Sequence, residues 1–157
     1  MRMTYPNLAI NAVFAATISL ATAPALAQAP ADLVRPFYTG EHFETDPEIR
    51  DAFFAGAAAE MLAKNEKQQE IEEGVGCIDF SLAFDAQDYD QEETNRTLKL
   101  DETVSGDTSK VVARFDLFGQ PRVIDWTLAM TPLGWRITDI ASPETGWRLS
   151  GFDCGGQ

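Results

Sequence analysis

Residues 111–118 read Val-Val-Ala-Arg-Phe-Asp-Leu-Phe, and residues 123–130 read Val-Ile-Asp-Trp-Thr-Leu-Ala-Met. In each stretch one set of alternate positions is wholly apolar, whereas the other set includes charged side chains. This period of two is typical of a β-strand with one face against a core. Gly119-Gln120-Pro121 separates the two stretches and predicts a turn. The two stretches therefore predict an antiparallel hairpin.

The same alternation continues on both sides of this hairpin. Upstream, alternate positions over 98–104 are apolar and lead into a turn signal at Ser105-Gly106-Asp107. Downstream, Thr131-Pro132-Leu133-Gly134 predicts a return into an apolar segment over 135–140. Four consecutive strands with short turns predict a meander that has one apolar face.

The segment before the strands shows helical patterns instead. Residues 33–40 predict a short helix that is strained by Pro36 and ends at Gly40. Thr45-Asp46-Pro47-Glu48 has the features of a helix start, with Thr45 as the cap and Glu48 three residues later. One continuous helix is expected to follow, with an apolar stripe formed by Ile49, Phe53, Ala57 and Met61.

The polar run over residues 65–70 predicts a solvated end to that helix. Helices followed by a series of strands favour an α+β fold, in which N-terminal helices pack on a curved antiparallel meander of about four strands. The length of the segment 28–157 fits a single domain.

Residues 1–27 have the features of a secretory signal peptide. Arg2 is followed by an apolar segment over 8–20 and by Ala25-Leu26-Ala27, a small-residue cleavage motif. The apolar segment is shorter than a bilayer span, and no cysteine follows the small residues to carry a lipid. We therefore expect cleavage before Gln28 and an exported protein, periplasmic or extracellular, without membrane insertion after cleavage.

The chain is strongly acidic, with 25 Asp and Glu against 12 Lys and Arg and a net charge of −13. Such a surface repels phosphate backbones and anionic lipid, which excludes nucleic acid as an expected partner. Either the charge keeps an exported protein in solution, or it forms an acidic docking face for a basic partner.

Cys77 and Cys154 are the two cysteines of the sequence. In an oxidising compartment such a pair predicts a disulfide, and its spacing does not fit a zinc site. The sequence contains no serine-nucleophile signature, phosphate-binding glycine loop or dinucleotide fingerprint. No metal and no cofactor are therefore expected.

The chain resembles the nuclear-transport-factor-2-like superfamily, which has a cone-shaped α+β fold. The resemblance lies in the order of helices followed by a meander and in the run Gly134-Trp135-Arg136-Ile137-Thr138-Asp139-Ile140. Gly76-Cys77-Ile78-Asp79-Phe80 and Ala86-Gln87-Asp88-Tyr89 resemble an exported bacterial domain family of unknown function within it, although Ser81-Leu82 stands where Asp-Pro is expected. The resemblance implies a pocket between sheet and helices. It implies no single activity, because that superfamily contains isomerases, dehydratases, binding modules and toxin-neutralising proteins.

His42 and Asp139 are the weak candidates for catalytic residues. His42 lies between two glutamates, but it has no partnered serine or cysteine, so a histidine packed in a loop is the favoured interpretation. Asp139 shares parity with Trp135 and Ile137, so a regular strand directs its side chain toward the core. A bulge near Ile140 is the favoured alternative, which leaves Asp139 to accept backbone hydrogen bonds.

Tyr38, Trp126 and Asp139 are the candidates for lining a pocket. Aromatic side chains at structural spacing usually form core, but Tyr38 and Trp126 can each place a polar atom at the mouth of an apolar cavity. A third group, Asp79, Asp85, Asp88 and Asp90, lacks the glycine and the terminal glutamate of a calcium loop, so a plain polar loop is expected there.

The sequence is most consistent with an exported, noncatalytic domain that binds a protein or a small apolar ligand. One alternative is a small pocket enzyme of isomerase or dehydratase type, in which an inward carboxylate such as Asp139 works with Tyr38 or His42. Another is an inhibitor that neutralises a secreted toxin through its acidic surface. An open pocket with a converging carboxylate and proton donor would favour the enzyme, whereas a pocket filled by Phe and Trp would count against it.

Overall fold

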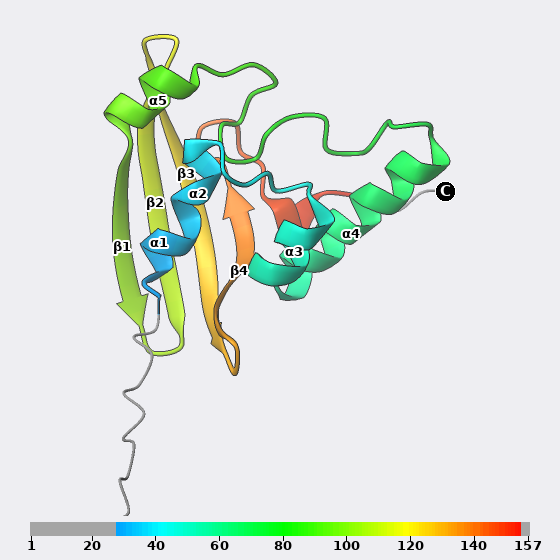
Figure 1. Cartoon of the computed structure of the whole chain (residues 1–157), viewed down its shortest axis with the longest axis horizontal. Coiled ribbons are helices and arrows are strands. Elements are labelled where there is room, and N and C mark those ends of the chain that lie inside the picture. The colour runs from blue at the N-terminus through cyan, green and yellow to red at the C-terminus, as the bar shows by residue number, and fades with distance from the viewer. Residues whose placement is uncertain (1–27, 155–157) are drawn as a thin grey trace, which may run out of the picture.

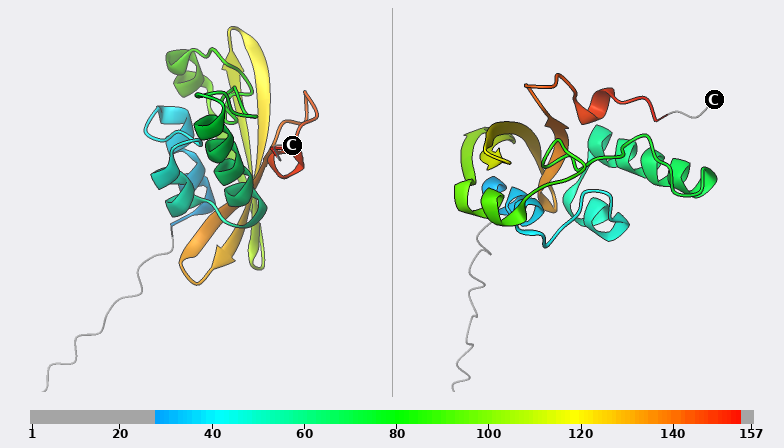
Figure 2. Two further views of the ribbon diagram at one scale, coloured as in Figure 1. Left: turned by 90° about the vertical axis from the view of Figure 1, so that its right-hand side faces the viewer. Right: turned by 90° about the horizontal axis from the view of Figure 1, so that it is seen from above.

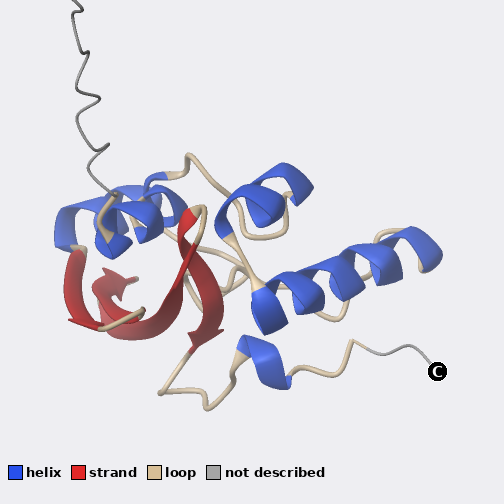
Figure 3. Ribbon diagram, turned by 90° about the horizontal axis from the view of Figure 1, so that it is seen from below, coloured by secondary structure: helices blue, strands red, loops and turns tan. Residues whose placement is uncertain are grey.

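The computed structural model describes residues 28–154, so the predicted signal peptide, residues 1–27, lies outside the described residues. The four strands are β1 (Lys99–Ser105), β2 (Thr108–Leu117), β3 (Gln120–Thr131) and β4 (Gly134–Ala141). They form one antiparallel sheet in the order β1-β2-β3-β4, as the alternation predicts. The sheet curves, with helices on its concave side (Figure 3).

Five helices precede the first strand in the sequence. They are α1 (Pro30–Val34), α2 (Pro36–Thr39), α3 (Pro47–Phe53), α4 (Gly56–Ile71) and α5 (Gln91–Thr97). Figure 1 shows α1 and α2 in front of the sheet, α5 beside the β2–β3 turn, and α4 beyond the β4 edge. Figure 2 shows the same arrangement from the side and from above. The predicted α+β fold, with N-terminal helices on a four-stranded meander, is confirmed.

The core follows the predicted strand faces. Alternate residues of β2 and β3 are buried beneath α1 and α2, which supply apolar side chains of their own. The largest fully buried side chains of the two strands are Leu117, Val111, Ile124, Trp126 and Leu128.

The continuous helix expected after residue 45 is wrong, because the chain breaks between α3 and α4. Asp46, and not Thr45, caps α3 by accepting a hydrogen bond of 2.9 Å from the backbone N–H of Glu48. At the break, Phe54 pairs with Ile137, and the Ala55 N–H donates to the Ile137 carbonyl at 2.9 Å. This bridge ties the helices to β4 and interrupts the expected apolar stripe.

Two polar segments also differ from expectation. The helix does not fray over 65–70, because α4 continues to Ile71 and Asn65 is 1% exposed, accepting the Ile78 N–H at 2.9 Å. Residues 91–97, for which the sequence patterns predicted no helix, form α5. Asp90 caps α5 by accepting from the Glu93 N–H at 2.9 Å, which supports a short polar helix without an apolar stripe.

After β4, a C-terminal segment packs against α4 through the one-turn helix η1 (Leu149–Gly151). Cys154 is buried and is joined to Cys77 by a disulfide with a Cα–Cα distance of 5.4 Å, which agrees with the expected pairing. Within residues 28–154, no helix has both the length and the apolar composition that crossing a bilayer requires.

Candidate functional site

The space between the helices and the sheet is filled by aromatic side chains. Tyr38 and Trp126 are both 0% exposed, and the Trp126 indole N–H donates a hydrogen bond of 2.9 Å to the Tyr38 hydroxyl. Phe37 and Phe115 pack on this pair, with ring centroids 5.1 Å from Trp126 and 5.3 Å from Tyr38 respectively. The expectation that Tyr38 and Trp126 line a cavity mouth is corrected, because their polar atoms bind each other inside the core.

A buried carboxylate lies near this pair, and no local sequence pattern singles it out. Glu44 is 4% exposed and accepts hydrogen bonds from the Ala83 N–H at 2.5 Å and from the Ser81 hydroxyl at 3.3 Å. Burial raises the pKa of Glu44 above its ordinary value of 4.5, although these hydrogen bonds oppose the shift. Burial likewise raises the pKa of the Tyr38 phenol, so Tyr38 stays protonated. Through its hydrogen bonds to Ser81 and Ala83, Glu44 anchors the 81–83 loop.

Asp139 is engaged with the C-terminal segment. Its carboxylate accepts hydrogen bonds from the Arg148 guanidinium at 2.7 Å, the Ser150 hydroxyl at 2.8 Å, the Ser150 N–H at 3.1 Å and the Ile140 N–H at 3.0 Å. The register changes between Thr127 and Leu128, which pair with Asp139 and Ile137. This bulge resets the parity of β4 and Asp139 accepts backbone hydrogen bonds, as the favoured interpretation predicted, so the alternative of an inward pocket carboxylate is wrong.

His42 packs in its loop. Its ring centroid lies 4.6 Å from that of Phe53 and 5.7 Å from that of Phe37. Its Nδ1 lies 2.8 Å from the Glu41 carbonyl oxygen, a hydrogen-bond contact within the same loop. The structure therefore brings together Tyr38 and Trp126, but it places His42 and Asp139 in separate networks.

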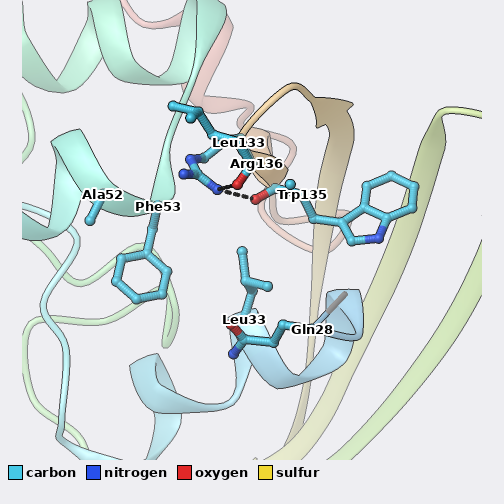
Figure 4. A pocket seen from close by; sticks show the side chains of 8 residues that line it. Gln28, Leu33, Ala52, Phe53, Leu133, Trp135 and Arg136 are labelled. Carbon is cyan, nitrogen blue, oxygen red and sulfur yellow. Dashed lines mark hydrogen bonds between the residues drawn. The ribbon is translucent and has the colours of Figure 1, made fainter. Parts of the chain in front are cut away.

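A cavity of about 360 Å³ lies between the N-terminal helices and the β3–β4 turn rather than within the core (Figure 4). It is lined by Gln28, Leu33, Ala52, Phe53, Leu133, Gly134, Trp135 and Arg136. The guanidinium of Arg136 donates to the carbonyls of Leu133 and Trp135 at 3.1 and 2.8 Å. This lining contains no carboxylate, so the cavity lacks the acid and donor pair that the enzyme alternative requires.

The acidic loop before α5 has a structural partner. The Asp85 carboxylate accepts from the Thr145 hydroxyl at 2.6 Å and from the Trp147 indole N–H at 2.5 Å, which joins the loop to the C-terminal segment. Among residues 28–154 no group of three or more His, Cys, Asp or Glu side chains could hold a metal ion. Asp79, Asp88 and Asp90 fit the polar loop that the sequence predicts.

Charge is unevenly distributed along the chain. On the outer face of the sheet, acids pair with bases across strands, as Lys110 does with Asp125 at 2.8 Å and Arg114 with Asp101. By contrast, residues 68–95 contain nine acidic residues and no Lys or Arg. We call this stretch the acidic segment; it runs from the end of α4 across the upper part of Figure 1 into α5.

Comparison of the sequence with known protein families finds no match, and comparison with curated proteins finds none either. Two solved structures are similar in fold. A chain of the native type VI effector–immunity complex Tae3–Tai3 from Ralstonia pickettii has a TM-score of 0.52 at 16% identity, covering 73% of this chain and 94% of that chain. A chain of the selenomethionine form of the same complex has a TM-score of 0.51 at 17% identity, covering 73% of this chain and 97% of that chain. At these identities the likeness concerns the fold.

Proposed function

We propose that this chain is an exported, noncatalytic protein-binding domain that neutralises a secreted effector protein. The observation that carries the proposal is the filled core, in which Tyr38 and Trp126 are fully buried and satisfy each other's polar atoms. A domain with a filled interior acts through its surface. Net charge and the acidic segment make that surface suited to a basic protein partner.

The groups that the enzyme alternative needs are used elsewhere. Asp139 is bound by Arg148 and Ser150, His42 packs on Phe53, and Tyr38 is buried with a raised pKa. Both cysteines form a disulfide, so neither supplies a thiolate nucleophile. These placements support a binding function over isomerase or dehydratase chemistry.

The fold likeness favours an inhibitor among binding functions. The similar chains belong to complexes of an effector with an immunity protein. Within residues 28–154, His42 packs in its own loop and the two cysteines are joined in a disulfide, so we compare this chain with the immunity protein of such a complex rather than with the effector. The predicted leader and the disulfide both fit an extracytoplasmic site of action.

The test uses residues 28–157 produced in an oxidising compartment and immobilised on a resin. The secreted proteins of the source bacterium are passed over it, and a control resin carries an unrelated protein of equal net charge, since an acidic surface retains basic proteins non-specifically. We expect one protein to be retained selectively, to bind with a submicromolar dissociation constant once purified, and to lose toxicity when this chain is co-expressed. Selective retention of none would refute the proposal.

A screen for turnover of enolisable ketones and hydroxy-acyl compounds tests the enzyme alternative directly. Activity that Asp139→Asn or His42→Ala abolishes by about 100-fold or more, with unfolding unchanged, would replace the proposed function with catalysis.

A further inference from the structure

The β2–β3 turn holds a bulky aromatic residue in an unfavourable backbone conformation. Leu117 pairs with Gln120, so Phe118 and Gly119 alone form the turn, with φ angles of 53° and 72°. Two-residue turns with both φ angles positive strongly favour Asn-Gly, because a large side chain at positive φ is strained. Burial does not compensate for this strain, since Phe118 is 63% exposed. A residue that tolerates positive φ would therefore stabilise this turn more than Phe118 does.

A dedicated contact keeps this turn in place. Both carboxylate oxygens of Glu93, on α5, accept backbone hydrogen bonds from the turn, at 2.6 Å from the Phe118 N–H and at 3.0 Å from the Gly119 N–H. A second link joins α5 to β2, because the Thr97 hydroxyl accepts the Asp116 N–H at 2.9 Å. The exposed ring is therefore carried on a fixed backbone, which lowers the entropy lost when the ring docks on a partner.

The turn that carries the ring lies against the acidic segment, which contacts it through Glu93. Glu93 belongs to the acidic segment, and Asp88, Asp90 and Glu92 of the same segment are exposed. The turn and α5 lie together at one end of the sheet, the upper end in Figure 1. An apolar ring that lies beside the acidic segment is complementary to an apolar recess bordered by Lys and Arg.

We propose that Phe118 is the anchor by which this domain docks on its partner, a protein with an apolar recess bordered by basic residues. Aromatic side chains dominate binding energy at interfaces when they enter a pocket, and a surrounding charged rim excludes wrong partners. This inference rests on the proposed function, which names a protein partner but no docking surface.

The experiment compares Phe118→Asn with Leu133→Asn, using the purified partner from the retention experiment and isothermal calorimetry. Asn accepts positive φ, so Phe118→Asn keeps the turn and removes the ring. Leu133 is the matched control, because it is an 80% exposed apolar residue in the turn at the opposite end of β3. We expect Phe118→Asn to weaken binding about 30-fold or more, Leu133→Asn less than threefold, and Phe118→Tyr to retain affinity.

Thermal unfolding separates a docking role from a structural one. We expect Phe118→Asn to unfold at the same or a higher temperature than the wild type, since the substitution relieves strain. Phe118→Asn that binds within threefold of the wild type overturns the inference while the proposed function stands. Equal losses in Phe118→Asn and Leu133→Asn also overturn it. If the wild type binds no partner, both the inference and the proposed function are refuted.

Photo-cross-linking locates the recess on the partner. We expect p-benzoyl-phenylalanine at position 118 to cross-link to a partner peptide that contains Lys or Arg, and the same group at position 133 to give no cross-link. A cross-link from position 118 to a second copy of this chain, with a dimer that Phe118→Asn dissociates, would show self-association instead and contradict the inference.

Discussion

The Trp126 indole N–H and the Tyr38 hydroxyl form a hydrogen bond of 2.9 Å across 88 residues of sequence, with both side chains fully buried. The bond joins α2 to the middle of β3 and lies at the centre of the packing between helices and sheet. Because the two polar atoms satisfy each other, neither is available to a ligand inside the core. The space between the helices and the sheet is thus filled by side chains whose polar atoms are already bonded.

Tyr38→Phe should destabilise the protein although it removes a single oxygen atom. The Trp126 N–H would be left buried without an acceptor, which costs about 1–3 kcal/mol. Urea unfolding followed by tryptophan fluorescence measures this loss. Tyr89→Phe is the control, since the Tyr89 ring stacks on Phe84 but its hydroxyl forms no hydrogen bond within residues 28–154. Equal losses in the two variants would contradict the role of the Tyr38–Trp126 bond.

Glu44→Gln should change the pH dependence of stability. Because burial raises the pKa of Glu44 in the folded state, the folded protein binds more protons than the unfolded chain at pH values between 4.5 and that raised pKa. The contribution of Glu44 to stability is therefore greatest in acid and is lost as the pH rises through this window. We expect Glu44→Gln to lack that loss and to be more stable than the wild type at pH 7.

The measurement for Glu44 is urea unfolding from pH 4 to 8, analysed as the difference between variant and wild type so that other titrating groups cancel. Glu60→Gln, the same substitution at an exposed position on α4, is the control. A flat difference for Glu44→Gln would show that the carboxyl does not titrate differently on folding.

Asp139→Asn should loosen the C-terminal segment without affecting the sheet. The substitution removes the charge that Arg148 and Ser150 bind, and we expect a loss of about 1–3 kcal/mol in unfolding free energy. Hydrogen exchange over 149–152 should accelerate. Asp125→Asn removes an ordinary surface ion pair with Lys110 and should cost about 1 kcal/mol or less. Equal effects would mean that Asp139 does not hold the segment.

Removal of the disulfide should lower stability by about 2–4 kcal/mol, since the bond closes a long loop in the unfolded chain. Cys77 and Cys154 are 77 residues apart, and Cys77→Ser, Cys154→Ser and the double variant should lose equal amounts. Thiol titration of the exported protein in denaturant should find no free thiol. Two reactive thiols, or a double variant as stable as the wild type, would show that no bond forms.

The sequence predicted most of the sheet and little of the site. Alternation over 111–118 and 123–130 set the strand faces, although the turn begins at Phe118 and not at Gly119. The resemblance to the nuclear-transport-factor-2-like superfamily stays a prediction. Asp139 was ambiguous, because parity holds only in a regular strand and the bulge beside Thr127 depends on how β3 and β4 pair.

The amino-acid sequence alone predicts the features that each element carries within its own length. These are the strand period, the turn residues, the excess of acid, and the pairing of two cysteines expected in an oxidising compartment. Only the tertiary structure decided which polar groups are buried. Asn65 accepts the Ile78 N–H, Glu44 accepts the Ala83 N–H and Glu93 holds the turn at Phe118, and each bond spans 13 or more residues. Loop N–H groups need acceptors when the chain folds over them, and distant side chains supply these only once the whole fold has formed.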